Sequence, residues 1–398
     1  MKIAHFPQSF FPTIGGAEIV VHNIAQEQAL LGHEVYVIVP PNAIKYVKEK
    51  EITVNYKLIP LYNKSLNLIL LAEQFKLNLN WIISCQVSAL QKKYRFDIWH
   101  FNTIAHYAFA SLKTLNKLNI PTVGTSHGGD IQIYHEVNYG LRRCPRFDSN
   151  LRKTIKKFSI LTSISETVKD EYLKLGLTNK KTPIVPNGCN VDRIKKYKFN
   201  KEQTLKRLNI PTNRSIILTI GRNHPKKGFM NIVSIIKYLL KMRDDFIWVL
   251  VGKDNETIAE SIKNEGLQDY FMLIPELGLD QNINMPSDET IEIYMLADIL
   301  CFPTIVEAFP LVLLEAMAAG LPIATTNAPG ARDSITNMKN GLISEVKDNV
   351  SMAKNINLIL KDSEIRKQLI SNGLIFIKDY EWVSVSRSYV NVYSQISE

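Results

Sequence analysis

The sequence has few cysteines and no long apolar run. Its four cysteines are scattered over 398 residues without CxxC spacing, so they predict neither a disulfide framework nor a zinc site, and a reducing compartment is expected. No stretch approaches the roughly 18 apolar residues of a transmembrane helix. Met1–Phe10 lacks the apolar segment of a signal peptide. We therefore expect a cytoplasmic protein that is at most peripheral on the inner face of the cytoplasmic membrane.

Acidic residues are scarce in the first half only. The segment from Met1 to Pro183 carries 23 Lys and Arg against 13 Asp and Glu, whereas the rest carries 25 of each kind. The net charge of +10 therefore lies entirely in the first half. This asymmetry indicates an anionic partner, for which a membrane surface, a lipid phosphate and nucleic acid are candidates. The alternative is that the basic surface only maintains solubility.

Short apolar segments alternate with helical stretches in both halves, which predicts parallel α/β architecture. The predicted strands are Lys2–Phe6, Val35–Val39, Ile98–Phe101, Pro121–Thr125 and Ile160–Ser163, then Ser215–Ile220, Phe246–Gly252, Phe271–Ile274, Ile299–Pro303 and Ile323–Thr326. The length suits two domains. A Pro/Gly-punctuated segment near Thr182–Asn190 marks the boundary, so we expect domains at 1–185 and 186–378. Residues 379–398 are expected to form a helix that packs back on the first domain.

Two loops of the first half follow predicted strands. Gly15-Gly16 precedes a predicted helix at Ala17–Leu31, and two glycines would let backbone N–H groups approach a ligand closely. The loop lacks the GxGxxG fingerprint of dinucleotide sites, and a purely structural turn is the alternative. His127 follows the strand at Pro121–Thr125, at the sheet edge where open α/β sheets bind ligands. The alternative is a histidine of the core.

Two further segments of the first half have open interpretations. Ser65–Leu90 is rich in Leu, Ile and Trp and has lysines beside it, so a core helix or an amphipathic helix on a membrane would fit. The basic run from Arg142 to Lys157 forms either a solvated face or a contact with an anionic acceptor.

The stretch from Phe302 to Pro322 carries two carboxylates, Glu307 and Glu315. A helix is predicted to begin close to Pro310, because proline suits a first helical turn. The two carboxylates are then at most about 12 Å apart along the helix axis, too far to share a proton or a metal. They could instead bind two ends of an elongated ligand, while the helix N-terminus between them attracts phosphate.

Cations precede this stretch at an earlier strand end. Gly221-Arg222 follows the strand at Ser215–Ile220, and Lys227 comes shortly after. Two cations, a helix N-terminus and two carboxylates together suit a ligand with a central diphosphate and hydroxyl-bearing rings at both ends.

In this order the motifs resemble those of the retaining glycosyltransferases of family 4. The matching motifs are Gly15-Gly16-Ala17-Glu18, His127, Pro186-Asn187-Gly188, Gly221-Arg222 with Lys227-Gly228, and the E-x7-E block from Glu307 to Glu315. The resemblance covers nearly the whole chain. It implies the GT-B fold, with two Rossmann-like domains whose parallel sheets face each other across a cleft. The first domain would bind the acceptor and the second a nucleotide sugar.

The resemblance also implies a role for each matching residue. Catalytic roles fall to His127, Arg222, Lys227 and Glu307: the two cations stabilise the leaving diphosphate, Glu307 holds donor-sugar hydroxyls, and His127 lies near the reacting carbon. No protein nucleophile is implied, because the family is described by front-face displacement with the leaving phosphate as base.

Binding roles are implied for a second set of residues. The donor would be bound by Gly15, Gly16, Phe309, Leu311, Val312 and Glu315. The last of these would bind the ribose. The acceptor would be bound by Asp130, Arg142 and Arg143. Neither a metal ion nor another cofactor is expected beyond the nucleotide sugar itself.

The expected activity is α-forming transfer of a hexose or N-acetylhexosamine to a saccharide or lipid-linked saccharide, in cell-surface polysaccharide or lipopolysaccharide synthesis. A UDP-sugar donor is favoured over a GDP-sugar, an anionic membrane is a further partner, and nucleic acid is not. The alternatives are a nucleotide-sugar epimerase on the same fold and a non-enzymatic basic binding protein. Two departures from the family pattern are Pro310, which cannot donate, and Ala328–Asp333, where GG-x-x-E is frequent.

Overall fold

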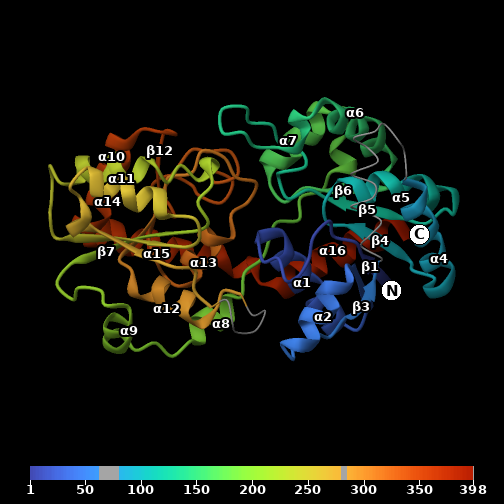
Figure 1. Ribbon diagram of the computed structural model, residues 1–398, viewed down its shortest axis with the longest axis horizontal. Helices are drawn as coiled ribbons and strands as arrows, with labels where there is room; N and C mark the ends of the chain where they lie inside the picture. The colour runs from blue at the N-terminus through green and yellow to red at the C-terminus, as the bar shows by residue number, and fades with distance from the viewer. Residues whose placement is uncertain (62–79, 279–284, 398) are drawn as a thin grey trace. The chain divides into compact units, whose positions relative to one another are not determined.

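The computed structural model describes residues 1–61, 80–278 and 285–397. The chain divides into two compact units (Figure 1). Unit 1 consists of Met1–Asn187 together with Trp382–Glu398, and unit 2 of Gly188–Glu381. The last helix therefore belongs to unit 1, although it follows unit 2 in the chain. Among the described residues, no helix is long and apolar enough to cross a membrane.

Unit 1 contains a parallel sheet of six strands. The strands are β1 (Lys2–His5), β2 (Glu34–Val39), β3 (Lys57–Pro60), β4 (Ile98–Phe101), β5 (Thr122–Thr125) and β6 (Ile160–Thr162). Their order is β3-β2-β1-β4-β5-β6, with Ile3 opposite both Val35 and Ile98. The strands are buried almost throughout, which explains why they are apolar without alternation. Strand β3 is the one that the sequence analysis did not predict.

The helices of unit 1 connect these strands. Among the described residues they are α1 (Gly16–Leu30), α2 (Pro41–Glu49), α4 (Asn80–Tyr94), α5 (His106–Lys117), α6 (Pro145–Thr154), α7 (Glu166–Lys174) and α16 (Trp382–Ser397). Within the segment Ser65–Leu90, residues 65–79 lie outside the described part. The rest belongs to α4, which buries Ile83 and Val87 and packs against α5 but leaves Trp81 exposed, so both interpretations of this segment stay open.

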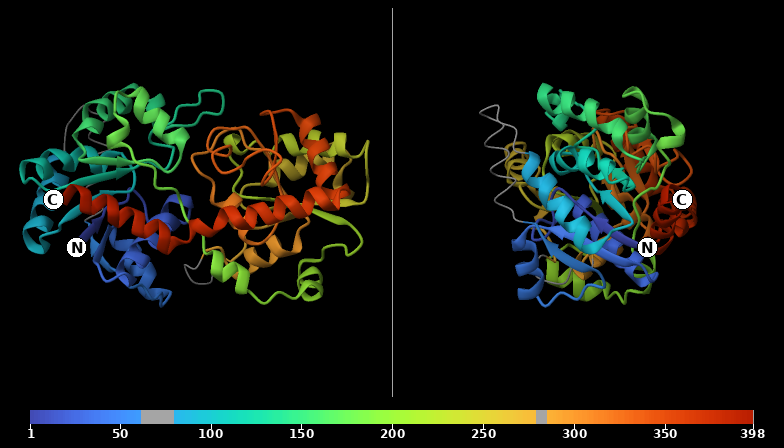
Figure 2. Two further views of the ribbon diagram at one scale, coloured as in Figure 1. Left: turned by 180° about the vertical axis from the view of Figure 1, so that it is seen from behind. Right: turned by 90° about the vertical axis from the view of Figure 1, so that its right-hand side faces the viewer.

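The C-terminal helix α16 packs against α1, and the two lie side by side in Figure 1 and in the left-hand view of Figure 2. Tyr393 of α16 is fully buried, and its hydroxyl lies 2.6 Å from Nδ1 of His100 on β4 and 3.3 Å from Nε2 of Gln28 on α1. Nε2 of His5 on β1 lies 2.8 Å from Oε1 of Gln28. Buried polar groups need such partners, so α16 completes the interior of unit 1.

Unit 2 contains a second parallel sheet of six strands. The strands are β7 (Ser215–Ile220), β8 (Phe246–Val251), β9 (Phe271–Ile274), β10 (Ile299–Phe302), β11 (Ile323–Thr326) and β12 (Leu342–Ser344). Their order is β12-β11-β10-β7-β8-β9, which repeats the order of unit 1. The predicted strands of the second half all lie in this sheet, and β12 is additional.

The helices of unit 2 are α8 (Val191–Lys196), α9 (Lys201–Leu208), α10 (Asn231–Leu239), α11 (Glu256–Asn264), α12 (Asp288–Leu296), α13 (Leu311–Ala318), α14 (Asn349–Lys361) and α15 (Ser363–Phe376). Helices α10 and α14 pack together over the sheet, and their apolar faces bury Trp248 and Phe246 in one core.

The strand order of each sheet is that of the doubly wound nucleotide-binding fold. In such sheets, ligands bind beyond the carboxyl ends of the strands, where the order reverses. In unit 2 the reversal lies between β7 and β10. The loops that follow these two strands are therefore the place where the fold favours a ligand site.

Candidate functional site

The loops after β7 and β10 are joined through their backbones. The first contains a 3₁₀ turn at Pro225–Lys227. The carbonyl oxygen of Lys226 in that turn accepts hydrogen bonds from the N–H of Ile305 at 2.8 Å and from Oγ1 of Thr304 at 3.0 Å. These bonds satisfy buried polar groups of both loops, so the two loops form one rigid surface.

Two glycines allow this close packing of backbones. Gly228 has φ +64°, and a Cβ there would lie 2.1 Å from the carbonyl oxygen of Pro303. Gly330 has φ +78°, and a Cβ there would lie 2.3 Å from the carbonyl oxygen of Glu307. The N–H of Glu307 also donates to the carbonyl of Pro329 at 2.9 Å. The turn that departs from the family pattern thus holds the backbone of Glu307.

The side chain of Glu307 lies between two lysines. Its Oε2 is 3.0 Å from Nζ of Lys226 and its Oε1 is 2.5 Å from Nζ of Lys227. The Lys227 ammonium also lies 4.9 Å from the ring centroid of Phe302. Side-chain exposure is 18% for each lysine and 7% for the glutamate, so these pairs are shielded from solvent. We call Lys226, Lys227 and Glu307 the ionic triad.

Burial and charge act against each other in the ionic triad. Burial alone would raise the pKa of Glu307, but the two lysines outweigh it and lower that pKa to about 2. For Lys227, burial lowers the pKa, and the opposing effect of Glu307 does not fully restore it. Because two cations face one carboxylate, the ionic triad carries a net positive charge.

A third cation lies near the ionic triad. Arg222 is exposed at the end of β7. Burial lowers the pKa of His224, and the charges of Lys226, Arg222 and Lys227 lower it further. These loops therefore form a positive site that suits a diphosphate.

The N-terminus of α13 follows the ionic triad in the chain. The helix begins at Leu311, one residue after the predicted start, because Pro310 is extended with ψ 122°. No side chain of the described residues caps this end, and the first-turn N–H groups of Leu311 and Val312 have no acceptor within the helix. The adjacent Phe309 is buried and stacks on Tyr380 with ring centroids 6.0 Å apart. The helix end thus presents free donors suited to an anion.

Glu315 has a different environment from Glu307. It is half-buried on α13, and its Oε2 accepts from the hydroxyl of Tyr294 on α12 at 2.8 Å. Burial raises the pKa of Glu315 to about 7, although the bond from Tyr294 acts to lower it. The surroundings therefore give the two carboxylates of the E-x7-E block very different pKa values.

The predicted site residues of unit 1 lie after β1 and β5. Gly15 is the N-cap of α1, and a Cβ there would meet Oε2 of Glu18 at 2.8 Å. Gly16 is exposed in the first turn, where a Cβ would meet nothing. His127 follows β5, and burial lowers its pKa to about 4. Its Nε2 has no hydrogen-bond partner among the described residues, so it can still bind a ligand.

Asp130 and Arg143 both have contacts inside unit 1. Asp130 is buried, and it accepts from the N–H of Ile104 at 2.6 Å and from Oγ of Ser126 at 2.5 Å. Burial raises the pKa of Asp130. The exposed Arg143 donates to the carbonyl and side-chain oxygens of Asn138 at 2.6 and 2.8 Å. The acceptor-binding role stays a prediction for both residues.

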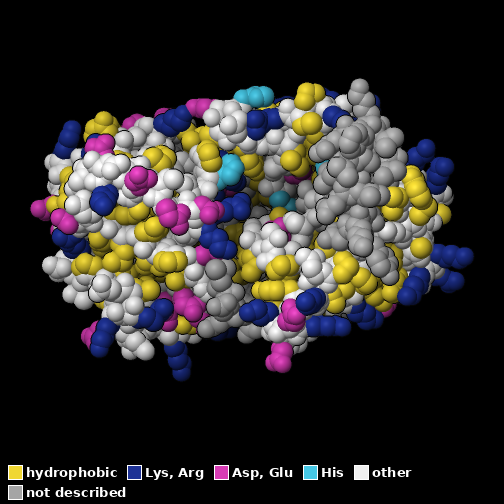
Figure 3. Space-filling view, viewed as in Figure 1, with side chains coloured by type: hydrophobic (Ala, Val, Ile, Leu, Met, Phe, Trp, Pro, Cys, Tyr) yellow, Lys and Arg dark blue, Asp and Glu magenta, His cyan; other side chains and the backbone are white. Residues whose placement is uncertain are grey.

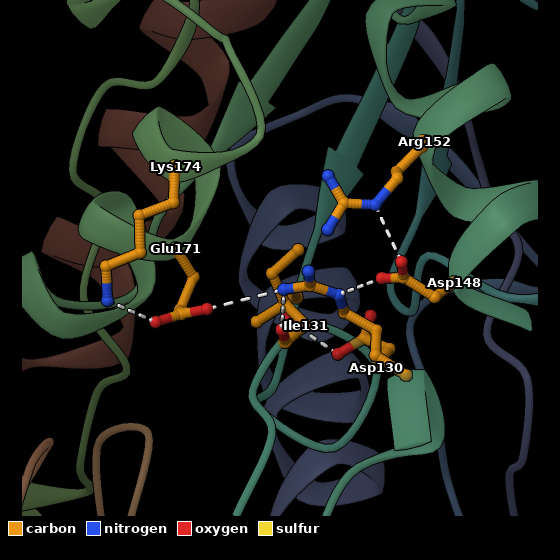
Figure 4. A network of polar contacts seen from close by, with 8 residues as sticks. Asp130, Ile131, Asp148, Arg152, Glu171 and Lys174 are labelled. Atoms are coloured by element: carbon orange, nitrogen blue, oxygen red, sulfur yellow. Dashed lines mark hydrogen bonds and ion pairs between the residues drawn. The ribbon is translucent and has the colours of Figure 1, made fainter. Parts of the chain in front are cut away.

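Arg142 is the centre of an internal network of ion pairs, and its partners Asp148, Glu171 and Ile131 are labelled in Figure 4. It is buried, and it contacts Asp148 at 2.6 Å, Glu171 at 3.3 Å and the carbonyl of Ile131 at 2.8 Å. Its guanidinium joins α6 and α7 to the loop after β5. These contacts support that loop, and the acceptor-binding role stays a prediction for Arg142 as well.

Several supporting residues were missed in the sequence. Lys226 adjoins the matched Lys227, but the family pattern gave no reason to choose both. Tyr294 lies on a different helix from its partner, and no sequence signal links them. Among the described residues, no group of three or more His, Cys, Asp or Glu is placed to hold a metal ion.

Comparison with known families identifies both units. The family model described as "Glycosyltransferase Family 4" matches residues 14–193, and the one described as "Glycosyl transferases group 1" matches residues 200–375. Together they match nearly the whole chain.

Individual proteins agree with these matches. The N-acetyl-alpha-D-glucosaminyl L-malate synthase of Bacillus anthracis is 25% identical over 372 residues, which is 90% of this chain and 88% of that protein. The lipopolysaccharide 1,2-N-acetylglucosaminetransferase of Salmonella typhimurium is 30% identical over 213 residues, 52% of this chain and 54% of that protein. The crystal structure of Anabaena Alr3699/HepE in complex with UDP has a TM-score of 0.76 at 16% identity and covers 99% of this chain and 100% of that one. The chain therefore belongs to the family 4 glycosyltransferases, has the GT-B fold and is an enzyme that acts on nucleotide sugars.

Proposed function

We propose that the chain is a retaining, α-forming glycosyltransferase that needs no metal ion. It moves a hexose or N-acetylhexosamine from a nucleotide sugar to a saccharide or lipid-linked saccharide. A UDP-sugar is the favoured donor, in keeping with the UDP bound to Anabaena Alr3699/HepE. The product belongs to a cell-surface polysaccharide or lipopolysaccharide, in keeping with the name of the Salmonella relative.

The ionic triad is the observation that carries this proposal. Breaking the bond between the sugar and the diphosphate leaves negative charge on the departing oxygen. Lys227, with Arg222 beside it, stabilises that charge from a buried position, where electrostatic effects exceed those in water. The lysine ammonium is shielded and already oriented by Glu307, so little reorganisation accompanies the reaction.

Each remaining group of unit 2 has a binding role. The carboxylate of Glu307 is ionised and accepts from donor-sugar hydroxyls. The N–H groups of Leu311 and Val312 donate to phosphate or sugar oxygens. Glu315 accepts from the ribose. The anomeric configuration is retained if the acceptor oxygen attacks the sugar carbon from the same face that the diphosphate leaves. The acceptor proton then passes to the departing phosphate oxygen. No side chain acts as a nucleophile in this reaction.

The basic charge of unit 1 supports an anionic membrane as a further partner. Lys and Arg side chains gather along the edge of unit 1 that carries α4 and α5 (Figure 3). Exposed lysines at the ends of these helices include Lys92, Lys93 and Lys117. Cosedimentation with phosphatidylglycerol vesicles, but not with phosphatidylcholine vesicles, is expected at low salt and is lost at high salt. Equal binding to both vesicles contradicts the proposal.

A panel of nucleotide sugars tests the donor. A nucleotide sugar at a hundred times its dissociation constant adds about 2.7 kcal/mol to the stability of the state that binds it, which raises the melting temperature. The donor found in this way is then used in a transfer assay without divalent ions, and the anomeric configuration of the product is read by NMR. An inverted product, or transfer that depends on added metal, contradicts the mechanism.

A further inference from the structure

One buried hydroxyl group donates a hydrogen bond to the side chain of Glu315. Tyr294 is fully buried on α12, and its OH donates to Oε2 of Glu315 at 2.8 Å. The other oxygen, Oε1, has no donor among the residues that the structure describes. Glu315 is only half-buried, so its side chain is open to a ligand, and Oε1 is the oxygen left to accept from it.

The contact restricts both the position and the charge of the carboxylate. A glutamate side chain has several rotamers, and a bond to a fixed phenol selects among them. Burial raises the pKa of Glu315, whereas the bond from Tyr294 acts in the opposite direction and favours the ionised form. An ionised carboxylate is acceptor-only, and it forms stronger hydrogen bonds than a neutral acid.

We propose that Tyr294 is a positioning residue for nucleotide recognition: its hydroxyl holds Oε2 of Glu315 so that Oε1 accepts from a ribose hydroxyl. This inference rests on the proposed function, which assigns Glu315 to the ribose. Tyr294 itself does not touch the ligand. Its role is to make Glu315 discriminate between ribose and deoxyribose.

The chain offers a matched control on the same helix. Tyr197 donates from its OH to Oε1 of Glu292 on α12 at 2.9 Å. This bond has the same chemistry as the pair of Tyr294 and Glu315, but it belongs to no part of the proposed site. Tyr197→Phe therefore removes a tyrosine–glutamate bond without affecting a ligand.

The test is calorimetric titration with uridine and guanosine diphosphate and with their 2′-deoxy and 3′-deoxy analogues. The wild type is expected to bind the ribose form of one nucleotide at least tenfold more tightly than the analogue that lacks the contacted hydroxyl. Tyr294→Phe is expected to reduce this ratio of dissociation constants, deoxy analogue over ribose form, to about threefold or less, while Tyr197→Phe leaves the ratio unchanged. In transfer assays, Tyr294→Phe raises KM for the donor and changes kcat by less than about twofold.

Each other result is decisive. A wild-type ratio that persists in Tyr294→Phe overturns the positioning role, because a purely structural tyrosine would not alter discrimination. If Tyr294→Phe does not fold, Glu315→Gln replaces it: the amide oxygen takes the bond from Tyr294 and the NH2 group faces the ligand, so the ratio changes. An unchanged ratio in Glu315→Gln overturns the inference. Absence of binding by the wild type instead contradicts the proposed function.

Discussion

Replacing Glu307 by glutamine tests whether the ionic triad is built for an anion. The substitution removes one negative charge and keeps the size of the side chain. It leaves the Lys226 and Lys227 ammonium groups, which Glu307 now separates, without their common partner. Two opposite effects follow, a loss of stability and a gain in affinity for anions.

The loss of stability follows from the burial of the triad. Breaking a buried ion pair typically costs about 3–5 kcal/mol, and the 18% exposure of each lysine places the expected cost near the lower end, at about 3 kcal/mol. For a unit of the size of residues 188–381, each kcal/mol lowers the melting temperature by about 2–4 °C. Calorimetry is therefore expected to show the unit 2 transition about 6–12 °C lower.

The pH of the measurement determines how much of this effect appears. The pKa of Glu307 is lowered to about 2 in the folded protein, below its ordinary value of 4.5. Its stabilising contribution is therefore complete above pH 4.5 and is lost only as the pH falls toward 2. A measurement at neutral pH therefore records the whole difference in unfolding free energy between the wild type and Glu307→Gln.

The gain in anion affinity arises because Glu307 competes with phosphate for the lysines. A carboxylate and a phosphate about 6 Å apart repel each other by about 1–3 kcal/mol, for effective dielectric constants between about 80 and 20. Glu307→Gln is thus expected to bind inorganic pyrophosphate about tenfold more tightly than the wild type. Sugar transfer is expected to fall about 10–100-fold, because the variant lacks the charged acceptor that we propose for the sugar hydroxyls.

A control separates this effect from the change in net charge. Glu265 pairs with Lys237 at the surface of unit 2, at 45–47% side-chain exposure. Glu265→Gln makes the same charge change and is expected to cost less than about 1 kcal/mol, with no change in pyrophosphate affinity. Weaker pyrophosphate binding by Glu307→Gln would refute the argument, because the lysines would then need the carboxylate in order to bind the anion.

Three further results are expected. Gly330→Ala places a Cβ 2.3 Å from the carbonyl oxygen of Glu307, so thermal unfolding and transfer assays are expected to show losses of stability and activity. These losses should exceed those of Gly266→Ala, because Gly266 also has a positive φ but has no atom within 4 Å of its Cβ position. Tyr393→Phe leaves Nδ1 of the buried His100 without its partner, and denaturant unfolding is expected to show unit 1 less stable by about 1–3 kcal/mol. Burial lowers the pKa of His100 well below 6.5, so unit 1 loses stability as the pH falls below 6.5. Hydrogen-exchange protection factors, which correct for the effect of pH on the intrinsic rate, are expected to fall in the peptides of unit 1 before those of unit 2. Equal acid sensitivity of both units would contradict this.

The strands could be predicted because their local signal agrees with their environment. Parallel strands that are buried on both faces read as continuous apolar runs, and those of Phe271–Ile274 and Ile98–Phe101 were predicted to the residue. The strand β3, Lys57–Pro60, was missed because two of its four residues are exposed and it ends in proline. Edge strands of this kind lack the apolar pattern on which the prediction depends.

The site could be predicted only as far as strand ends determine it. The loops after β7 and β10 meet at the point where the strand order reverses, which is why Lys227 and Glu307 come together. Lys226 was not predicted as a partner, because neighbouring residues usually point in different directions. The 3₁₀ turn at Pro225–Lys227 brings both ammonium groups to one carboxylate. The position of this turn depends on backbone hydrogen bonds to the loop after β10, and the sequence does not reveal these bonds.

The roles of charged residues depended on partners that are distant in sequence. Arg142 belongs to a basic run that suggested contact with an acceptor, yet Glu171 on α7 and Asp148 on α6 enclose it. A buried arginine requires such pairing, so Arg142 supports the elements around it, whereas the exposed Arg222 is available for the anion binding that we propose. Exposure separates the two cases, and exposure follows from packing rather than from the local sequence.

The opposed pKa values of Glu307 and Glu315 could suggest an acid/base pair of the kind that hydrolyses glycosides, with Glu315 as the acid. The contacts argue otherwise. Glu307 is ionised because two lysines neutralise it, and those lysines would weaken it as a nucleophile. Oε2 of Glu315 already accepts a hydrogen bond from Tyr294, which favours the ionised carboxylate. In that form Oε1 is better suited to accept from a ligand hydroxyl than to donate a proton. These contacts support the proposal that the two carboxylates accept from two ends of one ligand and that the positive charge beside Glu307 is available to the leaving diphosphate.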